Sequence, residues 1–141
     1  MCIRDRLQID PVDVRGLPDL EAAAATIRRS GAQAVFVPAD LSLQVDPHQV
    51  VRWIRKTNLP AVYQDHVFVD AGGLMSYGHS NRETIAGMVE YADRILKGAK
   101  PGDLPVIQVR NLRLVVNKRA ARELEISIPQ QLLIRADEVI E

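Results

Sequence analysis

The stretch AVFVPADLSLQVDPHQVVRWIRKTNLPAVY, residues 34–63, decides the fold class. It opens with a continuous apolar run at residues 34–37 and closes with another at residues 59–63, as is typical of strands covered on both faces. Between the two runs, Asp46 and Pro47 form a helix start, and apolar residues then recur at helical spacing. A strand, a helix and a second strand at this spacing predict a right-handed crossover between parallel strands.

The flanking sequence extends this pattern toward the N-terminus. Residues 7–14 alternate apolar and polar side chains, which predicts a strand with an irregularity at Pro11. A helix is predicted next, with Pro18 in its first turn and Gly31 as a left-handed cap. The sequence therefore predicts an α/β fold built on a parallel sheet with helices on both faces.

Toward the C-terminus the same kinds of signal continue. A strand is predicted at residues 73–77, and a helix from Ser80 to Lys97 is opened by the capping box at residues 80–83 and ended by Gly98. Further elements are predicted by apolar alternation and by turn residues: extended segments over residues 106–116, a short helix capped by Asn117, and a helical turn over residues 129–134.

Composition and charge exclude several classes of function. The chain has 141 residues, of which 47% are hydrophobic, and 18 basic residues balance 18 acidic ones. This length suits one compact domain. The absence of a positive excess argues against a general nucleic-acid binder and against a polybasic membrane-surface module. No apolar run approaches the ~20 residues of a membrane span. The single Cys2 excludes an internal disulfide and a cysteine-based zinc site.

The first six residues have no periodicity and no turn signal. They resemble a translated sequencing-adaptor remnant, so we expect a non-native or frayed start and draw no functional argument from residues 1–6. The opening of the chain does not have the pattern of a signal peptide.

Polar and aromatic side chains follow the predicted parallel strands. Ligands bind outside the carboxyl ends of the strands in open sheets of this kind. The candidates for a ligand site therefore stand at the ends of three predicted strands. Asp40 follows the strand at residues 34–37. Tyr63, Gln64 and Asp65 come at the end of the strand at residues 59–63, and Tyr77 at the end of the strand at residues 73–77. The alternative is structural: the aspartates begin turns, and the tyrosines pack with their hydroxyl groups in water.

Catalytic and metal-binding patterns are largely absent. Ser76 lacks the first glycine of a nucleophile elbow, and no glycine-rich phosphate loop occurs. The histidines, His48, His66 and His79, lack the spacing of a metal site. Asp65 and His66 form an acid–base pair without a nucleophile beside it. We therefore predict no catalytic residue, no cofactor and no bound metal.

Four stretches resemble a known family. They are PAVY (60–63), AGGLMSYG (71–78), YADRILKGAKPGDLPV (91–106) and LLIRADEVIE (132–141). Together they resemble the ABC transporter substrate-binding proteins whose better-known members take up tryptophan and related amino acids. The resemblance runs from about Leu7 to the end. It implies a type I periplasmic-binding fold of two lobes, about twice the length of this chain, so we expect a C-terminal fragment.

The resemblance also implies how the chain is organised and what it does. Residues 7–78 would form the α/β core of the second lobe, and residues 79–141 a crossover helix, a returning strand and hinge or tail segments. The full-length protein would be periplasmic or an extracytoplasmic lipoprotein. It would bind a small molecule, such as an amino acid, between its lobes and deliver it to inner-membrane permease subunits.

Roles for the candidate residues follow from the same comparison. Asp40 would accept a hydrogen bond from a ligand ammonium group. Gln64 and Asp65 would orient the ligand, Tyr77 would stack on it or line the hinge, and Tyr63 is a weaker candidate. Because one lobe supplies half a cleft, we expect weak or no binding by the isolated chain.

The crossing between lobes makes a structural prediction. The helix that begins near Ser80 would belong with the missing first lobe, so its apolar stripe would be poorly buried in this chain. The stripe consists of Ile85, Met88, Ala92 and Ile95.

Two other functions remain open. The chain could be the ligand-sensing core of a transcriptional regulator, which shares the fold, or a small doubly wound enzyme that uses Asp65 and His66. A signal peptide or lipobox upstream would favour the receptor, and a helix-turn-helix would favour the regulator.

Overall fold

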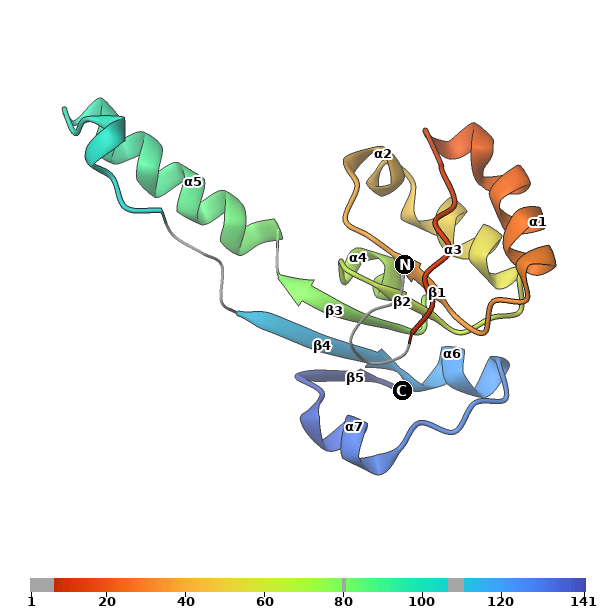
Figure 1. The fold of residues 1–141 in the computed structure, drawn as a ribbon. Helices are drawn as coiled ribbons and strands as arrows, with labels where there is room; N and C mark the ends of the chain where they lie inside the picture. The colour runs from red at the N-terminus through yellow and green to blue at the C-terminus, as the bar shows by residue number, and fades with distance from the viewer. Residues whose placement is uncertain (1–6, 80, 107–110) are drawn as a thin grey trace.

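A five-stranded sheet organises the chain (Figure 1). The computed structural model describes residues 7–79, 81–106 and 111–141, and for residues 81–83 the backbone alone. The strands lie in chain order: β1 (Val35–Val37), β2 (Ala61–Tyr63), β3 (Met75–His79), β4 (Leu112–Asn117) and β5 (Glu138–Ile140). The β1–β2, β2–β3 and β4–β5 pairs are parallel, and only β3 and β4 run antiparallel. The predicted α/β class with a mainly parallel sheet is confirmed.

The main core lies on one face of this sheet. The helices α1 (Leu20–Ser30), α3 (Pro47–Arg55) and α4 (Val67–Asp70) cover it, together with the single turn α2 (Leu41–Gln44). Val37 and Tyr63 point from neighbouring strands into this core, where they meet Val50 and Phe68. The predicted helix after residue 16 forms as the 3-10 turn η1 (Leu17–Asp19) and α1, and Gly31 ends it with a φ of 74°.

The C-terminal segment packs on the opposite face. Successive side chains of a strand point to opposite sides, so Met75 faces away from its neighbour Ser76. Met75 packs against a second cluster formed with Leu74, Ala120 and Ala121, in which α6 (Lys118–Glu123) takes part. The short helix α7 (Gln130–Arg135) precedes β5. Helices therefore lie on both sides of the sheet, but the second face is covered incompletely, because Phe36 is 63% exposed.

The helix α5 (Asn81–Leu96) extends away from the body (Figure 1). Its apolar residues are exposed: Ile85 by 59%, Met88 by 64% and Ile95 by 40%, and Ala92 is exposed as well. Beyond α5, the 3-10 turn η2 (Pro101–Asp103) begins the return, and Tyr91 donates a hydrogen bond to the carbonyl oxygen of Pro105. The prediction of a poorly buried stripe is confirmed.

The structure differs from the sequence predictions at the N-terminal end. Residues 7–14 form no strand beyond an isolated bridge at Gln8, so that strand prediction is wrong. Leu7 and Ile9 are 61% and 45% exposed, so the alternation of this segment does not bury one face. Pro11 also lacks the N–H group that a strand ladder needs.

Other element predictions hold with adjusted bounds. The one-turn helices α2 and α4 were not predicted, since single turns carry too few residues to show a period. The Asn117 side chain caps α6 by accepting a hydrogen bond from the Ala120 N–H at 3.0 Å, as predicted. The capping-box side chains at residues 80–83 lie outside the described residues.

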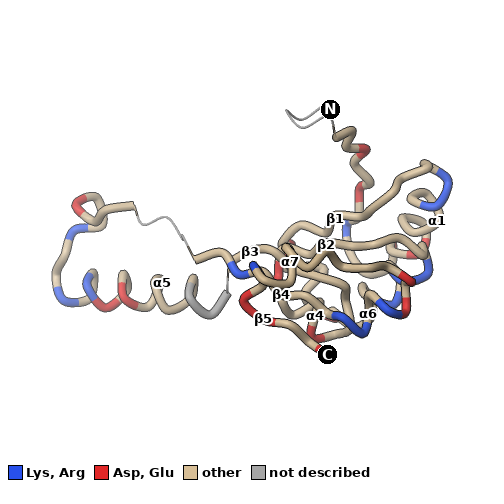
Figure 2. Tube along the Cα trace, turned by 90° about the horizontal axis from the view of Figure 1, so that it is seen from below, with Lys and Arg blue, Asp and Glu red and all other residues tan. Residues whose placement is uncertain are grey.

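Charge is distributed without a dominant sign. Figure 2 shows basic and acidic residues interspersed on the body and along α5. Within the residues that the structure describes, no helix combines the length and apolar character needed to cross a bilayer.

Candidate functional site

The loops that follow the carboxyl ends of β1 and β2 hold three of the five candidate residues: Asp40, Gln64 and Asp65. Asp40 follows β1 and caps α2, accepting hydrogen bonds at Oδ1 from the Ser42 N–H at 2.8 Å and the Ser42 hydroxyl at 2.7 Å. These bonds, first that of the Ser42 hydroxyl and then that of its N–H, lower the pKa of Asp40 below its ordinary value of 3.8. The carboxylate is thus exposed, ionised and fixed in direction.

Gln64 and Asp65 are held by contacts with the neighbouring segments. The Gln64 side chain accepts a hydrogen bond from the Ala39 N–H at 3.0 Å, which joins the loop after β1 to the loop after β2. Asp65 is only 2% exposed, and it accepts bonds from the Val67 N–H at 3.1 Å and the Gln44 amide at 3.3 Å. These two side chains therefore order the loops at the carboxyl ends of β1 and β2, which we call the carboxyl-end edge of the sheet.

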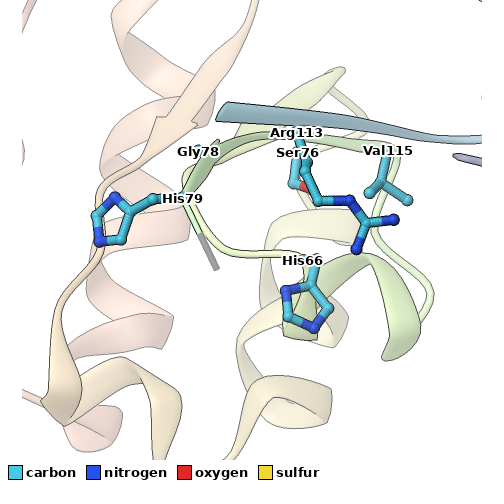
Figure 3. Close-up of a pocket in the computed structure, with 6 residues that line it drawn as sticks. All are labelled: His66, Ser76, Gly78, His79, Arg113 and Val115. Carbon is cyan, nitrogen blue, oxygen red and sulfur yellow. The ribbon is translucent and has the colours of Figure 1, made fainter. Parts of the chain in front are cut away.

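His66 stands between two carboxylates. Its Nδ1 lies 3.3 Å from Asp65 Oδ1, and its Nε2 lies 3.9 Å from Asp70 Oδ2. The His66 side chain is 40% exposed, and Figure 3 shows it on the same side of β3 and β4 as the Arg113 side chain. The sequence identified His66 only as a loop histidine or an acid–base group.

A small cavity lies where His66 meets β3 and β4. It has a volume of about 10 Å³ and is lined by His66, Ser76, Gly78, His79, Arg113 and Val115. Figure 3 shows His66 and Arg113 directed into the same space, whereas the His79 ring points away. This volume is close to what one water molecule needs. The cavity can therefore take one polar atom of a larger molecule lying across the edge.

The strand register explains how Arg113 reaches this place. Arg113 pairs with Gly78 across the antiparallel β3–β4 ladder, and Val115 pairs with Ser76. All four residues therefore point to the face that carries α4. Arg113 also forms an ion pair with Glu138 at 3.1 Å. The sequence analysis did not propose Arg113 or Ser76 as ligand-site residues. The apolar alternation of residues 112–116 does place Arg113 on the opposite face of its strand from the apolar residues, and this was the available signal.

The two tyrosines are separated by the sheet. Tyr77 is 53% exposed and lies on the face away from α4. Tyr63 is 1% exposed, and its ring stacks on Phe68 with centroids 5.1 Å apart. The structure brings Gln64 and Asp65 near the cavity, leaves Asp40 at the neighbouring strand end, and places the Tyr63 ring in the core.

Two glycines of the AGGLMSYG stretch are required by packing. A Cβ on Gly78 would collide with the backbone carbonyl of Gln64, and one on Gly73 would lie 2.6 Å from Tyr63 Cε2 and 2.7 Å from the Phe68 carbonyl oxygen. Only glycine allows β3 and its lead-in to approach the β2 loop this closely. The motif therefore sets the geometry of the carboxyl-end edge.

No cluster of three or more potential metal ligands occurs within residues 7–79, 81–106 and 111–141.

Comparison with known proteins identifies the family. The model of the family described as ABC transporter substrate binding protein matches residues 3–140. The chain belongs to this family. The comparison with curated proteins gives no match.

Three solved structures share the fold. One, titled as an ABC domain in complex with L-Trp from Streptococcus pneumonia, is 27% identical with a TM-score of 0.87; the match covers 97% of this chain and 46% of that one. A conserved domain protein from Vibrio cholerae is 24% identical, with a TM-score of 0.81 and coverage of 89% and 42%. A ligand-free, open substrate-binding protein with adhesive properties from Clostridium difficile is 16% identical, with a TM-score of 0.64 and coverage of 97% and 45%.

The matches cover only part of each of these solved structures. It spans less than half the length of each of the three structures. Proteins of this family bind substrates and are not normally enzymes.

Proposed function

We propose that this chain provides one lobe of the solute-binding component of an ABC uptake transporter, working outside the cytoplasm. In the whole protein, a first lobe would close over the carboxyl-end edge and trap a small molecule, which is then delivered to the permease. The role is capture and release without catalysis. The observation that carries the proposal is the edge itself, where Asp40, Asp65 and His66 are held in defined directions in a member of this family.

An amino acid is the ligand class that fits best. The solved relative at 27% identity is described as a complex with L-Trp. The exposed Asp40 carboxylate is suited to a ligand ammonium group, and the exposed Tyr77 ring offers a surface for stacking. Gln64 and Asp65 would orient the ligand by fixing the loops between these two groups.

The α5 helix supports the arrangement of two lobes. Its apolar residues are exposed over 16 residues, in a protein whose relatives have more than twice its length. We propose that α5 packs in the first lobe and that residues 7–78 and 79–141 are the core and the hinge-crossing part, respectively. Burial of this stripe on the first lobe would remove the exposed apolar surface from water.

Titration calorimetry of the full-length protein with a panel of amino acids, L-tryptophan included, tests the function. We expect one-site binding that Asp40→Ala and Tyr77→Ala weaken by about tenfold or more each, and that Arg28→Ala at the distant end of α1 leaves unchanged. The isolated chain should bind weakly or not at all. Absence of binding to the full-length protein, or binding insensitive to both variants, would contradict the proposal.

A further inference from the structure

A second, larger cavity lies at the opposite end of the sheet. It has a volume of about 130 Å³ and is found beside the amino ends of β2 and β3, between the end of α3 and α6. Its lining residues are Ile54, Arg55, Asn58, Leu59, Ala61, Tyr63, Gly72, Gly73, Leu74, Ala120, Glu123 and Leu124. These residues lie at the end of the sheet away from the loops that follow β1 and β2.

Most of the wall is apolar, and the Tyr63 side chain forms part of it. Tyr63 is 1% exposed, and within the described residues no fully buried side-chain oxygen or nitrogen lacks a hydrogen-bond partner, so the Tyr63 hydroxyl, which has no protein partner there, keeps contact with the solvent space. The ring edge lies against Gly73, which also lines the cavity. A bound molecule that pairs with this hydroxyl takes the place of water, and the hydrogen bond adds modestly to its binding.

Burial also keeps this hydroxyl protonated. It raises the pKa of Tyr63 well above the ordinary value of 10.0, and the nearby positive charge of Arg55 opposes the change only in part. At neutral pH the group is a neutral donor and acceptor, as an ordinary tyrosine is. The nearby positive charge of Arg55 disfavours a cationic ligand.

The rim of the cavity is polar and joins two helices. Arg55 Nη2 lies 2.7 Å from Glu123 Oε2 and donates a hydrogen bond to the Gly72 carbonyl at 3.1 Å. The two side chains of the ion pair are 47% and 44% exposed. Exposed ion pairs of this kind contribute little to stability, so this contact can open to admit a ligand at small cost.

We propose that this cavity is a second binding site, separate from the carboxyl-end edge, for a small, neutral, largely apolar molecule with one hydrogen-bonding group. The molecule places its apolar part among Ile54, Leu74 and Leu124 and its polar group on the Tyr63 hydroxyl. Its volume of about 130 Å³ is close to the ~150 Å³ of an apolar cavity that holds benzene.

The test uses the chain itself with phenol as the probe and benzene as the probe without a polar group. Amide chemical shifts in NMR spectra should move saturably at Gly72, Gly73 and Leu74, and phenol should bind more tightly than benzene. Tyr63→Phe keeps the ring packing and removes the hydroxyl. It should weaken phenol binding about three- to tenfold and leave benzene binding unchanged.

Two further variants complete the design. Leu124→Trp, at the half-buried wall, should fill the cavity and abolish binding of both probes, whereas Lys97→Ala, an exposed position just beyond α5, should leave both unchanged. Thermal melts confirm that each variant is folded. Absence of saturable shifts, a phenol-to-benzene preference that survives Tyr63→Phe, or an equal loss in Lys97→Ala overturns the proposal. Because the probes are not amino acids and this cavity lies at the opposite end of the sheet, failure here leaves the transporter function standing.

Discussion

Two helices of this chain have apolar residues at similar spacing, but these residues are buried in one helix and exposed in the other. In α1, Leu20, Ala23 and Ala24 are 5%, 7% and 3% exposed, and α1 packs against α3. In α5, Ile85 and Met88 at comparable spacing are 59% and 64% exposed. Helical periodicity thus predicts a face that needs a partner, but only the tertiary structure shows whether this chain contains that partner.

The difference extends to the glycines of the two regions. Gly78 in β3 faces the Gln64 carbonyl, where no Cβ can fit, whereas Gly87 in α5 has no atom within 4 Å of the position that a Cβ would occupy. The body is closely packed and sensitive to one added methyl group. At Gly87 in α5, an added methyl group would meet no atom beyond the backbone of its own helix and its chain neighbours.

The largest expected difference in the free energy of unfolding is between alanine substitutions at these two glycines. Gly78→Ala should destabilise the chain by about 3 kcal/mol or more, because β3 must move away from the β2 loop. Gly87→Ala should be neutral or stabilise by up to about 1 kcal/mol, since alanine is the better helix former. Urea unfolding followed by circular dichroism measures both, and equal effects would show that the two regions are packed alike.

The next prediction compares two large apolar side chains. Phe68→Ala should cost about 3–5 kcal/mol, because the ring is 0% exposed and stacks on Tyr63. Met88→Ala on α5 should change the free energy of unfolding by less than about 0.5 kcal/mol in this chain. In the full-length protein, Met88→Ala should become clearly destabilising if the first lobe covers it. An unchanged value there would contradict the assignment of α5.

A smaller effect is expected at the cap of α6. Asn117→Ala removes the hydrogen bond to the Ala120 N–H from a side chain that is 5% exposed, and should cost about 1 kcal/mol. Asn117→Asp keeps the acceptor and should recover most of the loss. Urea unfolding followed by circular dichroism measures the free energy of unfolding of both variants. Equal destabilisation by both would contradict the capping role of Asn117.

The smallest effect concerns the pH dependence at Asp40. Its folded pKa lies below the ordinary value of 3.8, so its contribution to stability is fully present above that value and is lost as the pH falls through the folded pKa. A carbon NMR titration should show the low pKa, and Ser42→Ala should raise it. Ser127→Ala, in an exposed segment elsewhere, should leave it unchanged. A normal pKa in the unsubstituted chain would contradict the Ser42 contacts.

The positions of the candidate residues in the fold could be predicted from the sequence only in part, for identifiable reasons. Asp40, Gln64 and Asp65 could be placed at strand ends, because parallel strands joined by helices bring their carboxyl ends to one edge. Ser76 and Arg113 could not be placed, since they meet only through the antiparallel register of β3 and β4 across a long excursion of the chain. The ring of Tyr63, the weaker ligand candidate, lies in the core and lines the second cavity, which depends on the packing around it and not on its place at a strand end. The roles in ligand binding stay predictions.

The sequence by itself determined the elements whose evidence is local: the β1–α3–β2 unit within residues 34–63, the Gly31 and Asn117 caps, and the amphipathic character of α5. These depend on spacing and backbone preference, which are properties of neighbouring residues. Only the tertiary structure decided which apolar faces find partners, why Gly73 and Gly78 cannot carry a side chain, and that the residues between Leu7 and Val14 form no strand. Each of these depends on what lies across from a residue, and residues distant in the chain supply it.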